Sequence, residues 1–323
     1  MMKAIFLESY GSLDELKYGE LPDPIPGEGE VVVDVNYAGV NFPDVLIVQG
    51  LYQFKPDLPF SPGGEVSGRI SAIGDSVTHL AIGDRVMAAA PFGGYAEKMK
   101  VSAGNVYQLP EEVNDKEAAI LQETYATAIH ALKDKGRLKP GERLLVLGAA
   151  GGTGIAALQI GKEMGAEVIA AASTKEKLEM CRKNGADHLI NYKEEDLKSR
   201  LKDIGGVDVI FDPVGGDHAE QAFRGIRPDG RHLIIGFTAG KIPALPWNLP
   251  LLKQASIVGV FWGGFWRVNP EGNRRNVEQL IQWLKEERIK PQIDKVLPLE
   301  KSREALEDII MRKVKGKIVL SIA

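Results

Sequence analysis

The chain has 323 residues, of which 44% are apolar and 26% are charged, and its 40 basic and 44 acidic residues give a formal net charge of −4. This length exceeds what one hydrophobic core comfortably supports, so we expect two domains, and the average composition excludes a disordered or fibrous protein. The small, evenly distributed charge does not favour nucleic acid or an anionic membrane as a partner. The single cysteine, Cys181, permits no internal disulfide and predicts a reducing, cytoplasmic setting.

No segment has the pattern of a signal peptide or a membrane span. Carboxylates interrupt the first twenty residues, beginning with Glu8. The longest uncharged run, residues 144–161, contains five glycines together with Thr153 and Gln159, so it predicts a strand, a turn and a helix.

The first 120 residues predict mostly β-structure, and the rest of the chain predicts alternating strands and helices. In the run 31–37 every odd position is apolar, which is the period of a half-buried strand, and turn signals such as Pro62-Gly63-Gly64 separate such runs. From about residue 123, apolar runs alternate with amphipathic helical segments, the pattern of a parallel sheet with crossover helices. Six strands are expected here, at residues 144–147, 168–172, 188–191, 207–214, 232–236 and 257–261.

The end of the chain predicts further helices and one more strand. Helical spacing at 277–284 and 305–310 precedes an apolar run at 317–321. We expect this tail to return to the first domain and make it discontinuous. The predicted division is 1–123 and 265–323 in one domain, with 124–264 in the other.

A glycine-rich turn follows the first strand of the second domain. Gly148-Ala149-Ala150-Gly151-Gly152-Thr153-Gly154 connects that strand to a helix, which is the arrangement that binds a pyrophosphate: small residues admit the phosphates, and the helix N-terminus meets their charge. Ala149 stands in place of the usual first glycine. We predict that the cofactor phosphates contact Ala150, Gly151, Gly152, Thr153 and Gly154. The alternative is a tight turn without a ligand.

The end of the second strand indicates which dinucleotide binds. Sites that prefer NAD place a carboxylate there for the ribose hydroxyls. Here Ser173, Thr174 and Lys177 follow the strand instead, which suits a 2′-phosphate and predicts NADPH. The alternative is that the lysines are only a solvated helix surface.

The glycine turn lies within a larger set of residues that resembles a known family. The stretch from Gly141 to Lys162 resembles the signature of the quinone oxidoreductase and zeta-crystallin branch of the zinc-free medium-chain dehydrogenases/reductases. Further blocks similar to this superfamily lie at 27–31, 39–44, 50–52, 62–68, 83–86 and 185–187. The resemblance implies an α/β protein with a GroES-like β-barrel catalytic domain, a Rossmann domain with a doubly wound, parallel six-stranded sheet, and a cleft between them.

The same resemblance implies that no metal is bound. Zinc-dependent relatives have a cysteine where Asn41 stands and a histidine where Gly64 stands. Glu65 remains, but a carboxylate without such partners does not make a zinc site. The five histidines are scattered without metal-binding spacing.

The resemblance also assigns roles to single residues. Asn41 and Tyr52 would contact the nicotinamide and substrate as catalytic residues, and Thr127 would lie near the cofactor. Ser173, Lys177 and Tyr192 match positions that hold the 2′-phosphate. The remaining predicted cofactor contacts are Gly236 and Phe261, at the ends of the fifth and sixth strands, and Arg312 and Lys317, in the basic tail.

The implied chemistry is hydride transfer from NADPH to a quinone, because without a Lewis acid the acceptor must itself be electrophilic. An enone, alkenal or enoyl-thioester reductase remains an alternative. A non-catalytic dinucleotide-binding protein, crystallin-like or RNA-binding, is another. A homodimer is predicted through pairing of the edge strand 257–261. The aromatic residues at 261–266 fit an interface, a wall of the substrate site or plain core packing.

Overall fold

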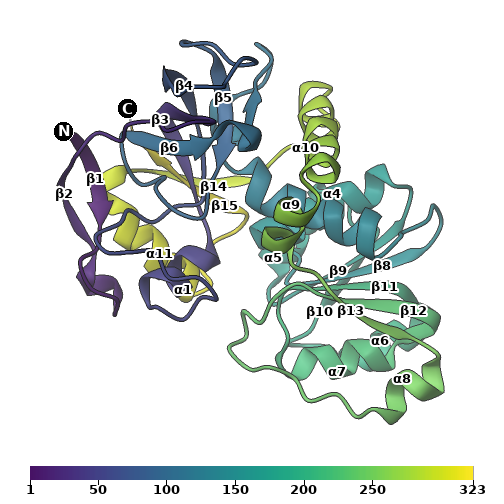
Figure 1. Ribbon diagram of the computed structural model, residues 1–323. Helices are drawn as coiled ribbons and strands as arrows, with labels where there is room; N and C mark the ends of the chain where they lie inside the picture. Colours follow the sequence, from purple (N-terminus) through teal and green to yellow (C-terminus); the bar gives the residue numbers. More distant parts are fainter. Residues whose placement is uncertain (323) are drawn as a thin grey trace. The chain divides into compact units, whose positions relative to one another are not determined.

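The computed structural model describes residues 1–322, which form two compact units (Figure 1). Unit 1 comprises Met1–Glu123, Ile281–Glu287 and the chain from Pro291 onwards. Unit 2 comprises Thr124–Leu280 and Arg288–Lys290. No helix among the described residues is both long and apolar enough to cross a membrane.

Unit 1 is built on a seven-stranded sheet in the order β14-β15-β3-β4-β5-β7, with β6 also paired to β3. Two further strands, β1 and β2, pair antiparallel. The strands are β1 (Met2–Phe6), β2 (Lys17–Leu21), β3 (Glu30–Val40), β4 (Glu65–Ile73), β5 (Arg85–Ala89), β6 (Lys98–Ser102), β7 (Val106–Gln108), β14 (Ile293–Pro298) and β15 (Lys317–Ser321). The helices are α1 (Phe42–Val48), α2 (Asp115–Ala118) and α11 (Ser302–Ile310).

Strand β3 pairs with three other strands of this sheet, β15, β4 and β6, and contributes apolar side chains to the core. Val31, Val33 and Val35 are buried in one apolar core, whereas Asp34 is exposed. Strand β15, near the end of the chain, pairs antiparallel with β3, so that Ile318 lies opposite Val40. The last strand of the sequence therefore completes a sheet that the first hundred residues begin.

Unit 2 contains a parallel sheet in the order β10-β9-β8-β11-β12-β13, the order of a doubly wound dinucleotide-binding fold. Its strands are β8 (Arg143–Leu147), β9 (Glu167–Ala172), β10 (His188–Asn191), β11 (Val207–Asp212), β12 (Ile226–Ile234) and β13 (Ser256–Gly259). Its helices are α3 (Thr127–Ile129), α4 (Gly152–Glu163), α5 (Lys175–Lys183), α6 (Leu197–Asp203), α7 (Gly216–Arg224), α8 (Asn248–Lys253), α9 (Trp262–Val268) and the larger part of α10 (Pro270–Lys285). The predicted fold class is confirmed.

One strand begins earlier than the sequence predicts. Strand β12 starts at Ile226, although Pro228, Asp229 and Gly230 have the composition of a turn. The pairing of β12 with β11 is irregular here, since Val207 lies opposite Ile226 but Val209 lies opposite Arg231. The turn residues thus form a bulge within the strand, where Asp229 has a positive φ of 61°.

Helices α9 and α10 contact each other and the helical residues His130 and Lys133, near the start of unit 2. The Phe265 ring stacks on His130 with a centroid separation of 3.8 Å. Trp262 Nε1 donates to Asn273 Oδ1 at 2.8 Å, and Lys133 Nζ donates to Asn276 Oδ1 at 2.9 Å. These contacts explain why residues 265–280 group with unit 2, whereas the predicted division assigns them to the other domain.

Candidate functional site

The glycine turn of unit 2 brings helix α4 very close to strand β8. The turn follows Leu147 and closes with a hydrogen bond from Gly151 N to Gly148 O at 3.0 Å, and Gly148 has a positive φ of 58°. A Cβ on Gly154 would lie 2.6 Å from Gly148 O, closer than side-chain carbons ever come. Only glycine fits at residue 154, so the helix N-terminus lies against the turn itself.

The N-terminus of α4 has the donors that a pyrophosphate needs. Gly151 is the N-cap residue and has no side chain to satisfy the first backbone N–H groups. The N–H groups of Gly152, Thr153 and Gly154 therefore point out of a twelve-residue helix whose dipole favours an anion. Small side chains leave room for phosphates here, so the N-terminus of α4 is suited to bind the pyrophosphate of a dinucleotide.

The sheet register brings several predicted residues to the same edge. Leu147 lies opposite Ala171, and Ala172 lies opposite Asn191, so the glycine turn, Ser173 and Tyr192 all follow carboxyl ends of adjacent parallel strands. Ligands of open α/β sheets bind at this edge.

Helix α5 begins at the end of β9 and carries the predicted phosphate-binding lysine. Thr174 is its N-cap residue, and the Thr174 hydroxyl accepts a hydrogen bond from the Lys177 backbone N–H at 3.2 Å. Thr174 is exposed, and Ser173 and Lys177 are half-buried. The Tyr192 ring lies against His218 with a centroid separation of 4.4 Å, and burial lowers the pKa of His218.

Three further predicted cofactor contacts belong to unit 2, and two of them follow the carboxyl ends of strands of the same parallel sheet. Gly236 follows β12, and Phe261 follows β13 with half of its surface exposed. Thr127 begins α3 and is half-buried. Their contact with a cofactor stays a prediction.

A buried contact between Asp212 and His232, which the sequence did not single out, lies beside the loop after β11. Asp212 Oδ1 accepts hydrogen bonds from the backbone N–H groups of Val214 and Gly215, both at 2.8 Å, and Asp212 Oδ2 lies 2.9 Å from His232 Nε2. The sequence carries a signal that could have identified Asp212: an acidic residue ends a buried strand directly before a glycine-containing loop. Asp212 thereby fixes a further loop at the edge that carries the glycine turn.

Unit 1 contains a buried polar cluster formed by Asn41, Asp44, Glu65, Tyr95 and Lys317. Each of these residues is at most 6% exposed. Asn41 lies between β3 and α1, and its Nδ2 donates to Glu65 Oε1 at 2.9 Å. Lys317 on β15 donates to Val40 O at 2.9 Å, to Glu65 Oε1 at 3.1 Å and to Asn41 Oδ1. The Lys317 ammonium therefore compensates the buried charge of Glu65.

Asp44 forms the second half of this cluster. Its Oδ2 accepts hydrogen bonds from the Asn41 backbone N–H at 2.8 Å and from the Tyr95 hydroxyl at 2.7 Å. Burial raises the pKa of Asp44 to about 6, although both hydrogen bonds act in the opposite direction. Burial, together with the neighbouring Asp44, raises the pKa of Tyr95 as well. Both groups thus hold their protons more tightly than in water.

The polar cluster changes the interpretation of two predicted site residues. An ammonium has three protons, and those of Lys317 have three acceptors within unit 1. This geometry favours a structural and electrostatic role over the predicted phosphate contact, which stays untested. One of the two Asn41 amide protons is bound to Glu65, which leaves the second for another partner.

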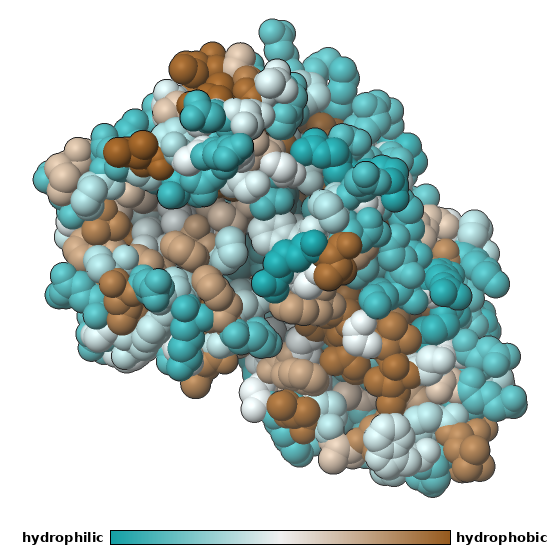
Figure 2. Space-filling view, viewed as in Figure 1, coloured by the Kyte–Doolittle hydropathy of each residue, from teal (hydrophilic) through white to brown (hydrophobic). Residues whose placement is uncertain are grey.

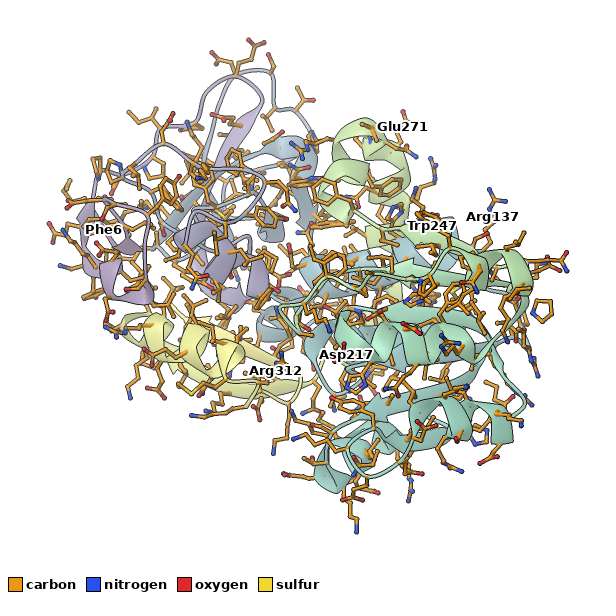
Figure 3. All side chains as sticks on the ribbon, turned by 90° about the horizontal axis from the view of Figure 1, so that it is seen from below. Phe6, Arg137, Asp217, Trp247, Glu271 and Arg312 are labelled. Carbon is orange, nitrogen blue, oxygen red and sulfur yellow. The ribbon has the colours of Figure 1, made fainter. Side chains whose placement is uncertain are left out.

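The other predicted residues of unit 1 lie outside the polar cluster. Tyr52 is half-buried and packs against the apolar core. Arg312 follows α11, is exposed and has a positive φ of 54° (Figure 3). Among residues 1–322, no group of three or more histidine, cysteine or acidic side chains is arranged to hold a metal ion.

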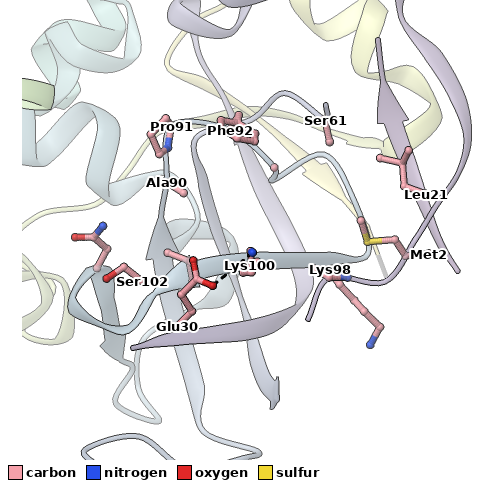
Figure 4. Close-up of a pocket in the computed structure, with 14 residues that line it drawn as sticks. Met2, Leu21, Glu30, Ser61, Ala90, Pro91, Phe92, Lys98, Lys100 and Ser102 are labelled. Atoms are coloured by element: carbon pink, nitrogen blue, oxygen red, sulfur yellow. Dashed lines mark ion pairs between the residues drawn. The ribbon is translucent and has the colours of Figure 1, made fainter. Parts of the chain in front are cut away.

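A separate cavity of about 420 Å³ in unit 1 contains none of the predicted site residues (Figure 4). Phe92 and Met2 contribute apolar walls, and Lys98 and Lys100 contribute charge. Lys98 pairs with Asp34 at 2.7 Å and Lys100 pairs with Glu30 at 3.4 Å. Because both ammonium groups are paired, the cavity presents little net charge.

Comparison with known proteins agrees with this architecture. Residues 27–111 match the family model for the alcohol dehydrogenase GroES-like domain, and residues 152–286 match the model for zinc-binding dehydrogenases. The chain is 39% identical over 297 residues to quinone oxidoreductase-like protein 2 of Bos taurus, and the match covers 91% of this chain and 85% of that protein. It is 33% identical over 328 residues to the quinone oxidoreductase of Mus musculus, covering 99% and 98% of the two chains.

A solved structure gives the same result. The structure of Escherichia coli quinone oxidoreductase complexed with NADPH matches this chain with a TM-score of 0.93 at 29% identity, and the match covers 99% of this chain and all of the other. Sequence and structure together therefore show that the chain belongs to the quinone oxidoreductase branch of the medium-chain dehydrogenase/reductase superfamily.

Proposed function

We propose that this oxidoreductase transfers a hydride from NADPH to a quinone without a metal ion. The observation that carries the proposal is the edge of the unit 2 sheet, where the uncapped N-terminus of α4 lies beside a strand end with hydroxyl and ammonium groups. The absence of a carboxylate between Ala172 and Lys175 favours the phosphorylated cofactor. The similar structure of the Escherichia coli enzyme complexed with NADPH supports the same assignment.

Bound NADPH supplies the hydride, and the chain supplies binding and orientation. The N–H groups of Gly152, Thr153 and Gly154 bind the pyrophosphate. Asn41 and Tyr52 hydrogen-bond the acceptor oxygen as it gains negative charge, Asn41 through the amide proton that Glu65 leaves free. Holding donor and acceptor in an aligned geometry provides much of the rate enhancement.

The proposal that no zinc takes part rests on residue chemistry. Zinc sites are built from thiolates, imidazoles and carboxylates. Here the polar cluster contains an amide, Asn41, and an ammonium, Lys317, in contact with Glu65. An ammonium that already neutralises Glu65 disfavours a second cation at the same carboxylate.

A homodimer formed through β13 is part of the proposal. This strand is at the end of the sheet, with Ile257 42% exposed and Phe261 50% exposed. Leu251, Leu252 and Trp247, on and beside α8, are also exposed, and α8 packs against β12, which adjoins β13. Hydrophobic residues are visible among hydrophilic ones on the surface in Figure 2, and Trp247 is labelled in Figure 3. Light scattering at micromolar concentration should return twice the mass of one chain.

The decisive experiment measures NADPH oxidation with a panel of quinones, enones and enoyl thioesters. We expect enzyme-dependent oxidation with 1,4-benzoquinone or a naphthoquinone. Oxidation with enones or enoyl thioesters alone would assign the chain to the alkene reductases instead. NADPH binding without turnover of any acceptor would favour a non-catalytic dinucleotide-binding protein.

A further inference from the structure

Glu123 has a carboxyl group beside the polar cluster, and the proposed function does not use it. It lies in the π-helical segment Gln122–Ala126, and such turns are rare and often occur at functional sites. Its backbone N–H donates to Glu65 Oε2 at 2.8 Å, while Glu65 Oε1 accepts from Asn41 Nδ2. A single carboxylate therefore bridges Glu123 and the residue proposed to contact the acceptor.

The side chain of Glu123 faces a position of the chain that has no side chain. A Cβ on Gly64 would lie 3.8 Å from Glu123 Oε2, so the carboxyl group faces residue 64, which has no side chain to cover it. The residue is half-buried, and no hydrogen bond to its carboxyl group is formed within residues 1–322. Glu123 thus retains a proton-bearing group that is partly accessible and not committed to another residue.

The charges around Glu123 keep that proton in place. Glu65 on β4 and Asp44 on α1 are both acidic, and the ammonium of Lys317 on β15 is bound to Glu65. Tyr95, bonded to Asp44, contributes no positive charge. Burial, then Glu65 and Asp44, raise the pKa of Glu123 to about 8 against the opposing effect of Lys317. At neutral pH the carboxyl group is therefore mostly protonated.

We propose that Glu123 is the proton donor of the reduction, and this role rests on the proposed hydride transfer to a conjugated acceptor. The acceptor gains a hydride with its electron pair and then a proton. The O–H bond of Glu123 breaks as a new O–H bond forms on the acceptor oxygen, which gives the hydroquinone from a quinone. Water then returns a proton to the Glu123 carboxylate, so hydride, proton and charge balance with the formation of NADP⁺.

The test compares E123Q, which keeps the shape but loses the acid, with E111Q, a control at an exposed glutamate of the same unit. We expect kcat to fall about 10²-fold in E123Q, as is typical for loss of a general acid, with the NADPH dissociation constant unchanged. In the wild type kcat should fall as pH rises through about 8, because the deprotonated acid cannot donate. That fall should disappear in E123Q and persist in E111Q and in E123D, which keeps a carboxyl group.

A second measurement does not depend on turnover. Infrared spectroscopy of the protein alone should detect a protonated carboxylic acid at pH 7 that is lost in E123Q and retained in E111Q. Absence of that band, or an E123Q enzyme with unchanged kcat and pH profile, would overturn the proposal. If the wild type reduces enones but not quinones, the quinone assignment fails and the variants are compared with the enone. A wild type that reduces no acceptor would overturn both.

Discussion

The candidate site of unit 2 and the polar cluster of unit 1 bind charge in opposite ways. In unit 2 the donors are backbone N–H groups of consecutive residues, Gly152 to Gly154, left free at a helix N-terminus. In unit 1 the groups are side chains from separate segments, and Lys317 reaches Glu65 across 252 positions of sequence. The first arrangement can be identified from a short motif, whereas the second exists only after the sheet has formed.

The two arrangements also differ in what they require of the fold. A glycine turn depends on close packing without side chains, so a substitution that adds a side-chain atom disturbs it. A buried ion pair depends on both of its charges, so a substitution that removes one of them leaves the other buried without compensation. Substitutions in the two regions should therefore affect different quantities, with stability dominating in unit 1 and cofactor binding in unit 2.

The largest effect is expected from Lys317→Met in the polar cluster. It leaves the Glu65 carboxylate, 1% exposed, without its counter-charge. Loss of one partner of a buried pair typically costs about 3–5 kcal/mol, which denaturant unfolding should measure. The exposed Lys313→Ala is the control and should change stability by less than about 0.5 kcal/mol. Equal stability of Lys317→Met and the wild type would show that Glu65 is not charged when folded.

A smaller effect, on binding, is expected from Lys177→Ala at the strand end of unit 2. A charge-assisted bond to a 2′-phosphate contributes about 1.5–3 kcal/mol, so NADPH affinity should fall roughly 10- to 100-fold. NADH lacks this phosphate and should bind almost unchanged in a fluorescence titration. The exposed Lys183→Ala, at the other end of α5, serves as control. Equal losses for both cofactors would contradict a role in phosphate recognition.

The third effect comes from the close approach at the glycine turn. Gly154→Ala places a Cβ 2.6 Å from Gly148 O, so α4 must move away from the turn, at a cost of about 1–3 kcal/mol in stability. Gly151→Ala is a matched control, because its Cβ would lie 3.5 Å from the same oxygen. Thermal unfolding of both variants should show the larger loss of stability for Gly154→Ala. Similar behaviour of the two would mean that the turn is not tightly packed.

The sequence predicts unit 2 better than unit 1 for physical reasons. The hydrophobic period, the turn residues and the glycine motif are local signals, so the sequence predicts all six strands of the parallel sheet. The bulge in β12 is not predicted, because its residues have the composition of a turn. The polar cluster depends on pairing between strands far apart in the chain. Asn41 and Lys317 are both singled out by resemblance, but their mutual contact follows from the register of β15 on β3. The position of Glu123 beside the polar cluster depends on its hydrogen bond with Glu65 on β4.

The place of β15 in the sheet has a consequence for the order of events during synthesis. Strand β15 lies between β14 and β3, and it also carries Lys317, the counter-ion of Glu65. The ribosome adds these residues after the whole of unit 2 has been made. Nascent unit 2 can therefore fold while the preceding unit still lacks two strands of its sheet, β14 and β15, and the buried charge of Lys317. The N-terminal part of this protein is begun first and completed last.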